Sequence, residues 1–186
     1  MLGLPTPLPT TVLTGFLGAG KTTLLNHLLT TARGVRIGAL VNEFGAVDID
    51  TSLLVSERAI STGVVELSNG CVCCTINESL CEAVAELLAR RADLDHLVIE
   101  TTGIADPQPV LDTLRLPRFA LALRVDAIVT VVNAERFLRS LAASASPMAP
   151  TAPTNAIAPA AADESECERL QLAAADLLVV NKSDLV

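Results

Sequence analysis

The chain has 186 residues, enough for one domain with a sizeable core, and its 51% hydrophobic against 18% charged content excludes disorder along the whole length. The net charge of −8 argues against a nucleic-acid partner and against an anionic membrane surface, because both need clustered Lys and Arg. No signal peptide and no run of 18 or more apolar residues is evident in the sequence, so we expect a cytoplasmic protein without a membrane span.

Short apolar runs rich in β-branched residues indicate strands that are buried on both faces. In chain order these runs are Thr11–Thr14, Val35–Val41, Leu97–Ile99, Ala127–Val132 and Leu177–Val180. Helix-forming segments with apolar residues at helical spacing lie between them, at Lys21–Thr31, Ile76–Arg91 and Cys167–Ala174. The alternation predicts an α/β fold with a mostly parallel sheet, in which ligands lie beyond the carboxyl ends of the strands.

Two segments break this pattern. Residues 1–9 carry three prolines and are expected to form an N-terminal tail. Residues 142–163 are rich in Ala, Pro, Ser and Thr, and they predict a flexible or extended insertion with neither strand nor helix.

The segment Gly15 to Thr22 matches the phosphate-loop pattern G-x-x-x-x-G-K-[ST] in full, and it lies between an apolar strand and a helix. Glycines allow backbone N–H groups to wrap a phosphate, and the helix N-terminus adds partial positive charge. We expect Lys21 to reach the β- and γ-phosphates and the Thr22 hydroxyl to ligate Mg²⁺. The predicted nucleotide-binding residues of this loop are Gly15, Gly18, Ala19, Gly20, Lys21, Thr22 and Thr23.

A second nucleotide motif, Asn181-Lys182-Ser183-Asp184, follows the last apolar strand. The N-K-x-D pattern suits guanine, because the Asp184 carboxylate can accept hydrogen bonds from N1–H and the exocyclic amine, which adenine does not offer together. Asn181 is expected to fix the loop or contact the base, and Lys182 to lie over the face of the base. GTP is therefore the predicted nucleotide.

The segment Glu100-Thr101-Thr102-Gly103 follows the strand at 97–99. An acidic residue at such a strand end is where phosphate-loop enzymes hold Mg²⁺, directly or through water, so we expect this role for Glu100. The backbone N–H of Gly103 is expected to meet the γ-phosphate and to respond to the nucleotide state. Lys21, Glu100 and Gly103 are thus the predicted catalytic residues.

Three of the five cysteines, Cys71, Cys73 and Cys74, lie within four residues, which fits a reducing compartment and a metal or redox role better than a disulfide framework. In an extended segment Cys71 and Cys73 point to one side, and a turn at Cys74 can bring its sulfur round. Three thiolates at about 2.3 Å leave one tetrahedral position on Zn²⁺ open. Glu43, water or a recipient protein could supply the fourth ligand, while a redox relay and an inert core remain as alternatives.

Together the motifs GFLGAGKTT, NEFG with Ile49-Asp50, NGCVCCT, ETTGIADP and NKSDL, in this order, resemble the CobW family of GTP-dependent metallochaperones, which is similar in fold to UreG and HypB. The resemblance implies a three-layer P-loop NTPase domain and slow GTP hydrolysis. It further implies that the GTP and Mg²⁺ state controls binding of Zn²⁺ or Co²⁺ at the C-x-C-C motif and delivery to a client metalloprotein. It assigns Glu43 and Asp50 to a nucleotide-responsive switch, with Asp50 also a candidate Mg²⁺ ligand.

The chain ends at Val186, directly after the guanine motif. We therefore expect residues 1–186 to form a P-loop GTPase domain, truncated after that motif and without the C-terminal domain of the family. Two other functions remain open at this point. One is a P-loop phosphotransferase with a small-molecule acceptor, and the other is a non-catalytic zinc-binding regulatory module.

Overall fold

The structure, a computed structural model, describes residues 6–41, 64–66, 76–145 and 160–186. Six strands form one sheet in the order β3-β2-β4-β1-β5-β6, and every pairing between neighbouring strands is parallel. This confirms the predicted α/β fold with a parallel sheet. The strands are β1 (Leu8–Thr14), β2 (Ile37–Val41), β3 (Val64–Glu66), β4 (His96–Glu100), β5 (Leu123–Asn133) and β6 (Leu177–Asn181).

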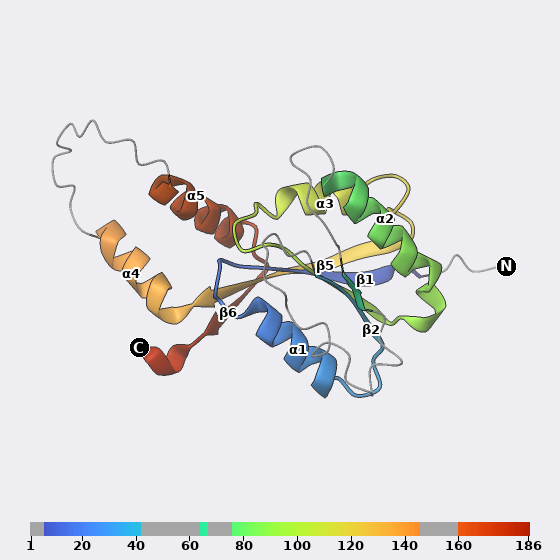
Figure 1. The fold of residues 1–186 in the computed structure, drawn as a ribbon, viewed down its shortest axis with the longest axis horizontal. Helices are drawn as coiled ribbons and strands as arrows, with labels where there is room; N and C mark the ends of the chain where they lie inside the picture. Colours follow the sequence, from blue (N-terminus) through green and yellow to red (C-terminus); the bar gives the residue numbers. More distant parts are fainter. Residues whose placement is uncertain (1–5, 42–63, 67–75, 146–159) are drawn as a thin grey trace.

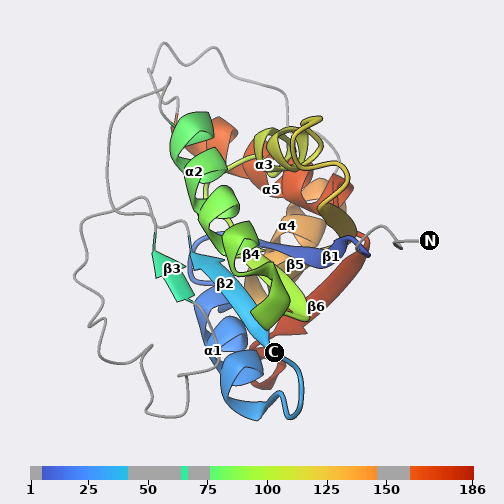
Figure 2. The ribbon, with the colours of Figure 1, turned by 90° about the vertical axis from the view of Figure 1, so that its right-hand side faces the viewer.

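Helices lie on both sides of the sheet, giving the three predicted layers. Helix α1 covers one face, and α2, α3 and α5 cover the other, while α4 lies beyond the end of β5 (Figure 1, Figure 2). The helices are α1 (Lys21–Thr31), α2 (Ile76–Ala89), α3 (Gln108–Leu114), α4 (Ala134–Ala145) and α5 (Ala160–Ala173), with the 3-10 turns η3 (Arg91–Asp93) and η4 (Ser183–Leu185). No helix within the described ranges is long and apolar enough to cross a bilayer.

Residues 97–99 of β4 and all of β2 are apolar because both faces of the sheet are covered, whereas β1 also buries Thr10 and Thr14. On β4, Leu97 and Ile99 belong to the hydrophobic cluster shared with α2 and α3, whereas Val98 belongs to the cluster shared with α1. Side chains alternate between the two faces along a strand, so burial of both faces favours apolar residues at successive positions. Burial on both faces thus explains why residues 97–99 are apolar without alternation.

The edge strand β6 differs from this expectation. Leu177, Leu178 and Val180 are 56%, 45% and 54% exposed, so the prediction of a strand buried on both faces is wrong for β6 within the described part of the chain. Among the described strands β6 pairs only with β5, so no described strand lies on its far side. Apolar composition alone does not distinguish a central strand from such an edge strand.

Other differences concern element boundaries. Strand β1 begins at Leu8, inside the expected tail. Residues 142–145 continue α4 and residues 160–163 begin α5, so the prediction that 142–163 contains no helix is wrong at both ends. The alanines there favour helix, and the prolines of this segment fall in residues 146–159, which lie outside the described ranges. The elements β3, α3 and α4 were not predicted.

The strand register brings several polar strand ends to one edge of the sheet. Leu13 of β1 pairs with Glu100 of β4, and Thr14 pairs with Thr130 of β5. Asn133 pairs with Asn181 at the ends of β5 and β6. Parallel strands end on the same side, so residues from distant parts of the chain meet at this edge.

At the amino ends of the strands, an ion pair joins the residues that precede β2 and β4. Arg36 Nη2 lies 2.9 Å from Asp95 Oδ1, and Arg36 Nε donates to Asp95 Oδ2 at 3.0 Å. The Arg36 backbone N–H donates to the same carboxylate at 2.8 Å. The Arg36 guanidinium and this backbone bond lower the pKa of Asp95 from 3.8 to about 2.

This pKa shift predicts a defined acid dependence of stability. A carboxylate whose pKa is lowered by folding stabilises the fold above its ordinary pKa, and the contribution is lost as the pH falls from about 4 to about 2. We expect Asp95→Asn to lower the unfolding free energy at pH 7 and to match the parent chain near pH 2, as measured by urea denaturation at both values. Asp93→Asn removes a nearby exposed charge and is the control. A constant difference between Asp95→Asn and the parent across this range would contradict the assignment.

Candidate functional site

The phosphate loop connects β1 to α1 and lies against β5. Gly15 has φ +138°, and a Cβ atom placed on it would lie 2.1 Å from the Val131 carbonyl oxygen. No side chain fits in that gap, so the pattern requires glycine here for packing as well as for ligand approach. Gly18, in contrast, has φ +69° with nothing within 4 Å of the added Cβ. The loop is thus tightly packed at its start and open at its centre.

The first turn of α1 faces the end of β4. Lys21 is buried at 7% exposure, and its Nζ donates to the Phe16 carbonyl oxygen at 3.3 Å. The Thr22 hydroxyl donates to Glu100 Oε1 at 2.6 Å, although the two residues are 78 positions apart. Glu100 is only 5% exposed. A cation, a hydroxyl and a carboxylate therefore converge at the mouth of the loop.

The segment after β4 is bonded to the end of β1. Thr101 N–H donates to the Leu13 carbonyl oxygen at 2.9 Å, and the Thr101 hydroxyl donates to Thr14 Oγ1 at 2.9 Å. Thr101 and Thr102 are both buried, and Gly103 follows them next to Leu17 of the phosphate loop. The predicted γ-phosphate segment thus lies directly beside the phosphate loop.

The guanine motif reaches the same loop from β6. Asn181 Nδ2 donates to the Ala19 carbonyl oxygen at 2.8 Å, and Asn181 Oδ1 accepts from Lys182 N–H at 2.9 Å. Lys182 has φ 57°, a left-handed conformation that turns the chain into η4. Asp184 lies in η4 with an exposed side chain. Two roles were expected for Asn181, fixing the loop or contacting the base. The hydrogen bond to Ala19 is of the first kind, because it ties the loop after β6 to the phosphate loop.

The thiol motif lies elsewhere in the chain. Cys71, Cys73, Cys74, Glu43 and Asp50 all fall outside the described residues. Within the described ranges, no group of three or more Cys, His, Asp or Glu side chains is arranged to hold a metal ion. The predicted metal site therefore remains a prediction.

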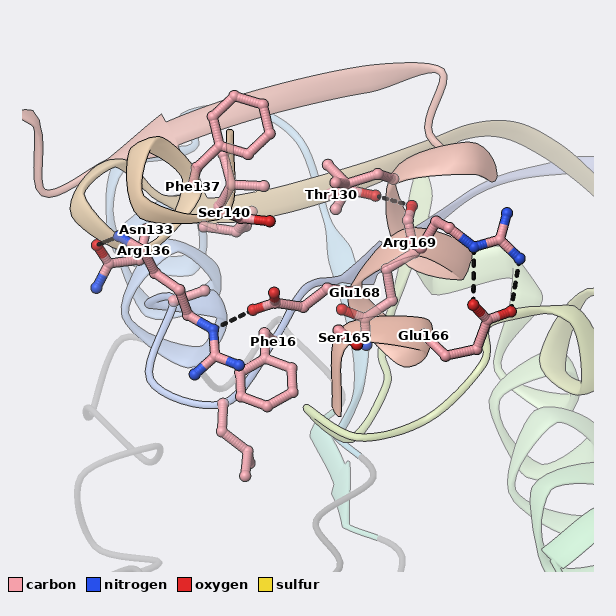
Figure 3. Close-up of a pocket in the computed structure, with 16 residues that line it drawn as sticks. Phe16, Thr130, Asn133, Arg136, Phe137, Ser140, Ser165, Glu166, Glu168 and Arg169 are labelled. Atoms are coloured by element: carbon pink, nitrogen blue, oxygen red, sulfur yellow. Dashed lines mark hydrogen bonds and ion pairs between the residues drawn. The ribbon is translucent and has the colours of Figure 1, made fainter. Parts of the chain in front are cut away.

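A cavity of about 310 Å³ beside the phosphate loop was not predicted. It lies between β5, α4 and α5, and Figure 3 shows Arg136 over the ring of Phe16 with Glu168 beside it. The Arg136 Cζ atom is 3.8 Å from the Phe16 ring centroid, and its guanidinium is paired with Glu168. Such a cation–π contact connects α4 and α5 to the loop. Phe16 lies within the phosphate-loop motif, but no motif in the sequence marks Arg136 or Glu168.

A second ion pair lines the same cavity. Arg169 donates two hydrogen bonds to Glu166, at 2.8 Å and 2.6 Å, and holds the pKa of Glu166 below its ordinary value. Both side chains are exposed, so this pair contributes little to stability. The buried amide of Gln171, also in the cavity wall, was missed as well, since a single glutamine in a helix carries no sequence signal.

The packing of the phosphate loop predicts that a Gly→Ala substitution lowers the unfolding free energy far more at Gly15 than at Gly18. Gly15→Ala places a methyl group against the Val131 carbonyl, and we expect a loss of more than about 4 kcal/mol in unfolding free energy, or no folding. Gly18→Ala meets open space and bears only the left-handed penalty of about 1 kcal/mol. Urea denaturation without nucleotide measures both. Equal stability of the two variants would mean that the loop does not lie against β5 as described.

Comparisons with known proteins agree with this geometry. The chain is 42% identical to the zinc chaperone CobW of Pseudomonas aeruginosa, covering 95% of this chain and 49% of that protein. It is 36% identical to the zinc-regulated GTPase metalloprotein activator 1 of Schizosaccharomyces pombe, covering 97% and 40%. The chain thus spans about half the length, or less, of these relatives.

Solved structures show the same fold. The Zn(II)-bound YjiA GTPase of Escherichia coli matches with a TM-score of 0.62 at 27% identity, covering 97% of this chain and 51% of that one. The hydrogenase maturation factor HypB of Archaeoglobus fulgidus matches with a TM-score of 0.56 at 20% identity, covering 96% and 68%, which supports the fold alone. The family described as CobW/HypB/UreG, nucleotide-binding domain, matches residues 9–186, and the chain belongs to this family.

Proposed function

We propose that this domain binds and hydrolyses GTP and uses the nucleotide state to control a zinc ion destined for a client metalloprotein. The observation that carries the first part is the 2.6 Å hydrogen bond from Thr22 to Glu100 at the mouth of a glycine-rich phosphate loop. It joins the two oxygen groups that phosphate-loop enzymes use around Mg²⁺. The relatives named as zinc chaperone and zinc-regulated GTPase support the second part.

The residues around the loop fit Mg²⁺ and a triphosphate. Hydroxyl and carboxylate oxygens are the ligands that Mg²⁺ prefers, so Thr22 and Glu100 would hold it, with Asp50 as a further candidate. Mg²⁺ held there would supply positive charge that neutralises the charge of the phosphate oxygens. Buried Lys21 and the N-terminus of α1 provide positive charge for the phosphates. Gly103 is proposed to contact the γ-phosphate through its N–H group.

Guanine recognition is proposed for the loop after β6. Asn181 holds this loop against the phosphate loop through Ala19, so a base bound by Asp184 would lie within reach of the same nucleotide. The Asp184 carboxylate is exposed and able to accept from the two guanine donors, and Lys182 would cover the face of the base. These contacts favour GTP over ATP.

Zinc is proposed as the cargo, with Cys71, Cys73 and Cys74 as thiolate ligands and Glu43 as a candidate fourth ligand. Soft thiolates bind Zn²⁺ more tightly than Co²⁺, in line with the general order of affinities. A site with one position open to exchange suits transfer to a client protein better than a closed structural site. Hydrolysis of GTP would then weaken the site and release the ion.

The proposed coupling predicts that nucleotide and zinc each increase the affinity of the domain for the other. We expect a non-hydrolysable GTP analogue with Mg²⁺ to tighten Zn²⁺ binding by about 5- to 150-fold, and Zn²⁺ to tighten binding of the analogue by the same factor. Isothermal titration calorimetry in both orders measures the two factors. The triple variant Cys71→Ser, Cys73→Ser, Cys74→Ser should lose Zn²⁺ binding, while Cys81→Ala, a buried thiol on α2, should keep it. Affinities that are independent of each other would refute the coupling.

The base assignment predicts a switch of nucleotide preference. In Asp184→Asn the new amide can donate to the carbonyl that xanthine has in place of the guanine amine, so we expect preference for xanthosine triphosphate over GTP. Competition binding with both nucleotides measures the change. Asp112→Asn, an exposed carboxylate on α3, is the matched control and should retain GTP preference. An unchanged preference in Asp184→Asn would remove this residue from the base site.

A further inference from the structure

A buried glutamine on α5 is bonded to the segment beside the phosphate loop. Gln171 is 1% exposed, and its Nε2 lies 3.1 Å from the Gly103 carbonyl oxygen and 3.1 Å from the Ala105 carbonyl oxygen. The amide group carries two N–H donors, which match these two acceptors. The backbone carbonyl of Gln171 in turn accepts from the Thr130 hydroxyl at 3.0 Å. One side chain thus ties α5 to residues 103–105 while the helix itself is held on β5.

The residue that Gln171 holds is in direct contact with the phosphate loop on its other side. A Cβ atom on Gly103 would lie 2.7 Å from the Leu17 backbone nitrogen and 2.8 Å from the Leu17 Cα. The backbone at Gly103 therefore approaches the loop more closely than any other residue type permits. The contacts run in sequence from α5 through Gln171 to Gly103 and then to Leu17.

The turn that contains Gly103 accepts both Gln171 hydrogen bonds through its backbone carbonyls. Its own backbone bond, from Ala105 N–H to the Thr102 carbonyl oxygen, is long at 3.4 Å. A buried amide in a helix is costly unless its donors are satisfied, and here the donors are satisfied by carbonyls of this turn. An apolar side chain of similar size would fill the same space without fixing the turn. The amide is therefore suited to set the position of the turn.

We propose that Gln171 is a positioning residue that keeps Gly103 docked against the phosphate loop and transmits the nucleotide state to α5. The inference rests on the proposed GTPase function, in which Gly103 meets the γ-phosphate. Because Gln171 holds the backbone carbonyls, and its described side-chain hydrogen bonds include no residue of the phosphate loop, it acts on hydrolysis through the turn. Nucleotide bound at the loop stabilises the docked turn, and the docked turn stabilises α5 through the same two hydrogen bonds.

The kinetic test uses Gln171→Met, which keeps the size of the side chain and removes both donors. We expect kcat for GTP hydrolysis to fall about 30-fold, the factor given by two hydrogen bonds of about 1 kcal/mol each, with KM changed less than about twofold. The matched control is Gln108→Met, since Gln108 is exposed on α3 and bonds only Asp112 among the contacts described for its side chain. A thermal melt of each variant reports folding. An unchanged kcat in a folded Gln171→Met chain would overturn the proposal.

A second variant separates positioning from packing by its pH dependence. Gln171→Glu places a carboxylate against two carbonyl oxygens, which repels them when ionised but donates one hydrogen bond when protonated. We expect its kcat, relative to the parent chain at the same pH, to rise as the pH falls from 8 to 5.5, because burial favours the neutral acid. The kcat of Gln171→Met relative to the parent chain should stay constant over this pH range. A constant ratio for both variants would contradict the role of the donor.

Hydrogen exchange of the unsubstituted chain tests the coupling without any variant. With a non-hydrolysable GTP analogue and Mg²⁺, amides of residues 164–173 and 103–106 should exchange more slowly than with GDP. Equal exchange of α5 in a chain that hydrolyses GTP would overturn the inference and leave the proposed function intact. Absence of GTP binding and hydrolysis would overturn the proposed function together with the inference. Release of inorganic phosphate from labelled GTP distinguishes these two results.

Discussion

The close approach of the phosphate-loop backbone to its neighbours is the constraint on which the rest of this site depends. The space between Gly15 and the Val131 carbonyl excludes any side chain, and a Cβ atom on Gly103 would lie 2.7 Å from the Leu17 backbone nitrogen on the other side. The loop is thus held between β5 and the segment after β4, and its shape follows from packing as well as from its own sequence. A loop held in this way presents its N–H groups to an anion at little cost in conformational entropy.

Burial of opposite charges follows from this packing. Lys21 and Glu100 are 7% and 5% exposed, and burial of either charge without polar contacts would be strongly unfavourable. The Phe16 carbonyl and the Thr22 hydroxyl provide such contacts at the same mouth. A site of this kind, with fixed dipoles and low exposure, strengthens its interaction with a charged ligand relative to water. Because both charges are buried, loss of the polar contacts of Lys21 or of Glu100 would destabilise this region.

Helix α5 is connected to the phosphate loop and to the turn after β4 at two points on one side of the sheet. Gln171 bonds the turn after Gly103, and Glu168 pairs with Arg136, which lies over Phe16 of the phosphate loop. Gln171 and Glu168 both line the same cavity, so movement of the loop or of the turn would change the contacts of the helix. A site controlled by nucleotide needs an element with such contacts if the state of one region is to reach another. Cys71, Cys73 and Cys74, which are proposed as zinc ligands, lie outside the described residues.

The sequence by itself determined the local features. The phosphate loop, the guanine motif and the central strands were predictable, because each depends on residue types at fixed short spacing or on apolar runs that both sheet faces require. The edge position of β6 was not, since an exposed strand with Leu177 and Val180 has the composition of a buried one. The seven-residue α3 gave no periodic signal long enough to read, whereas the 12-residue α4 is amphipathic and was overlooked. Alanines at the two ends of the proline-rich segment belong to α4 and α5.

Only the tertiary structure decided which distant groups meet. Thr22 lies beside Glu100 because parallel strands β1 and β4 end in register, and Asn181 reaches Ala19 because β6 follows β5 in the sheet. Gln171 meets Gly103 across 68 positions through helix packing, which no pattern in a single helix can reveal. Contacts of this range depend on strand order and on the orientation of whole elements, and these are set by the balance of many weak interactions across the fold.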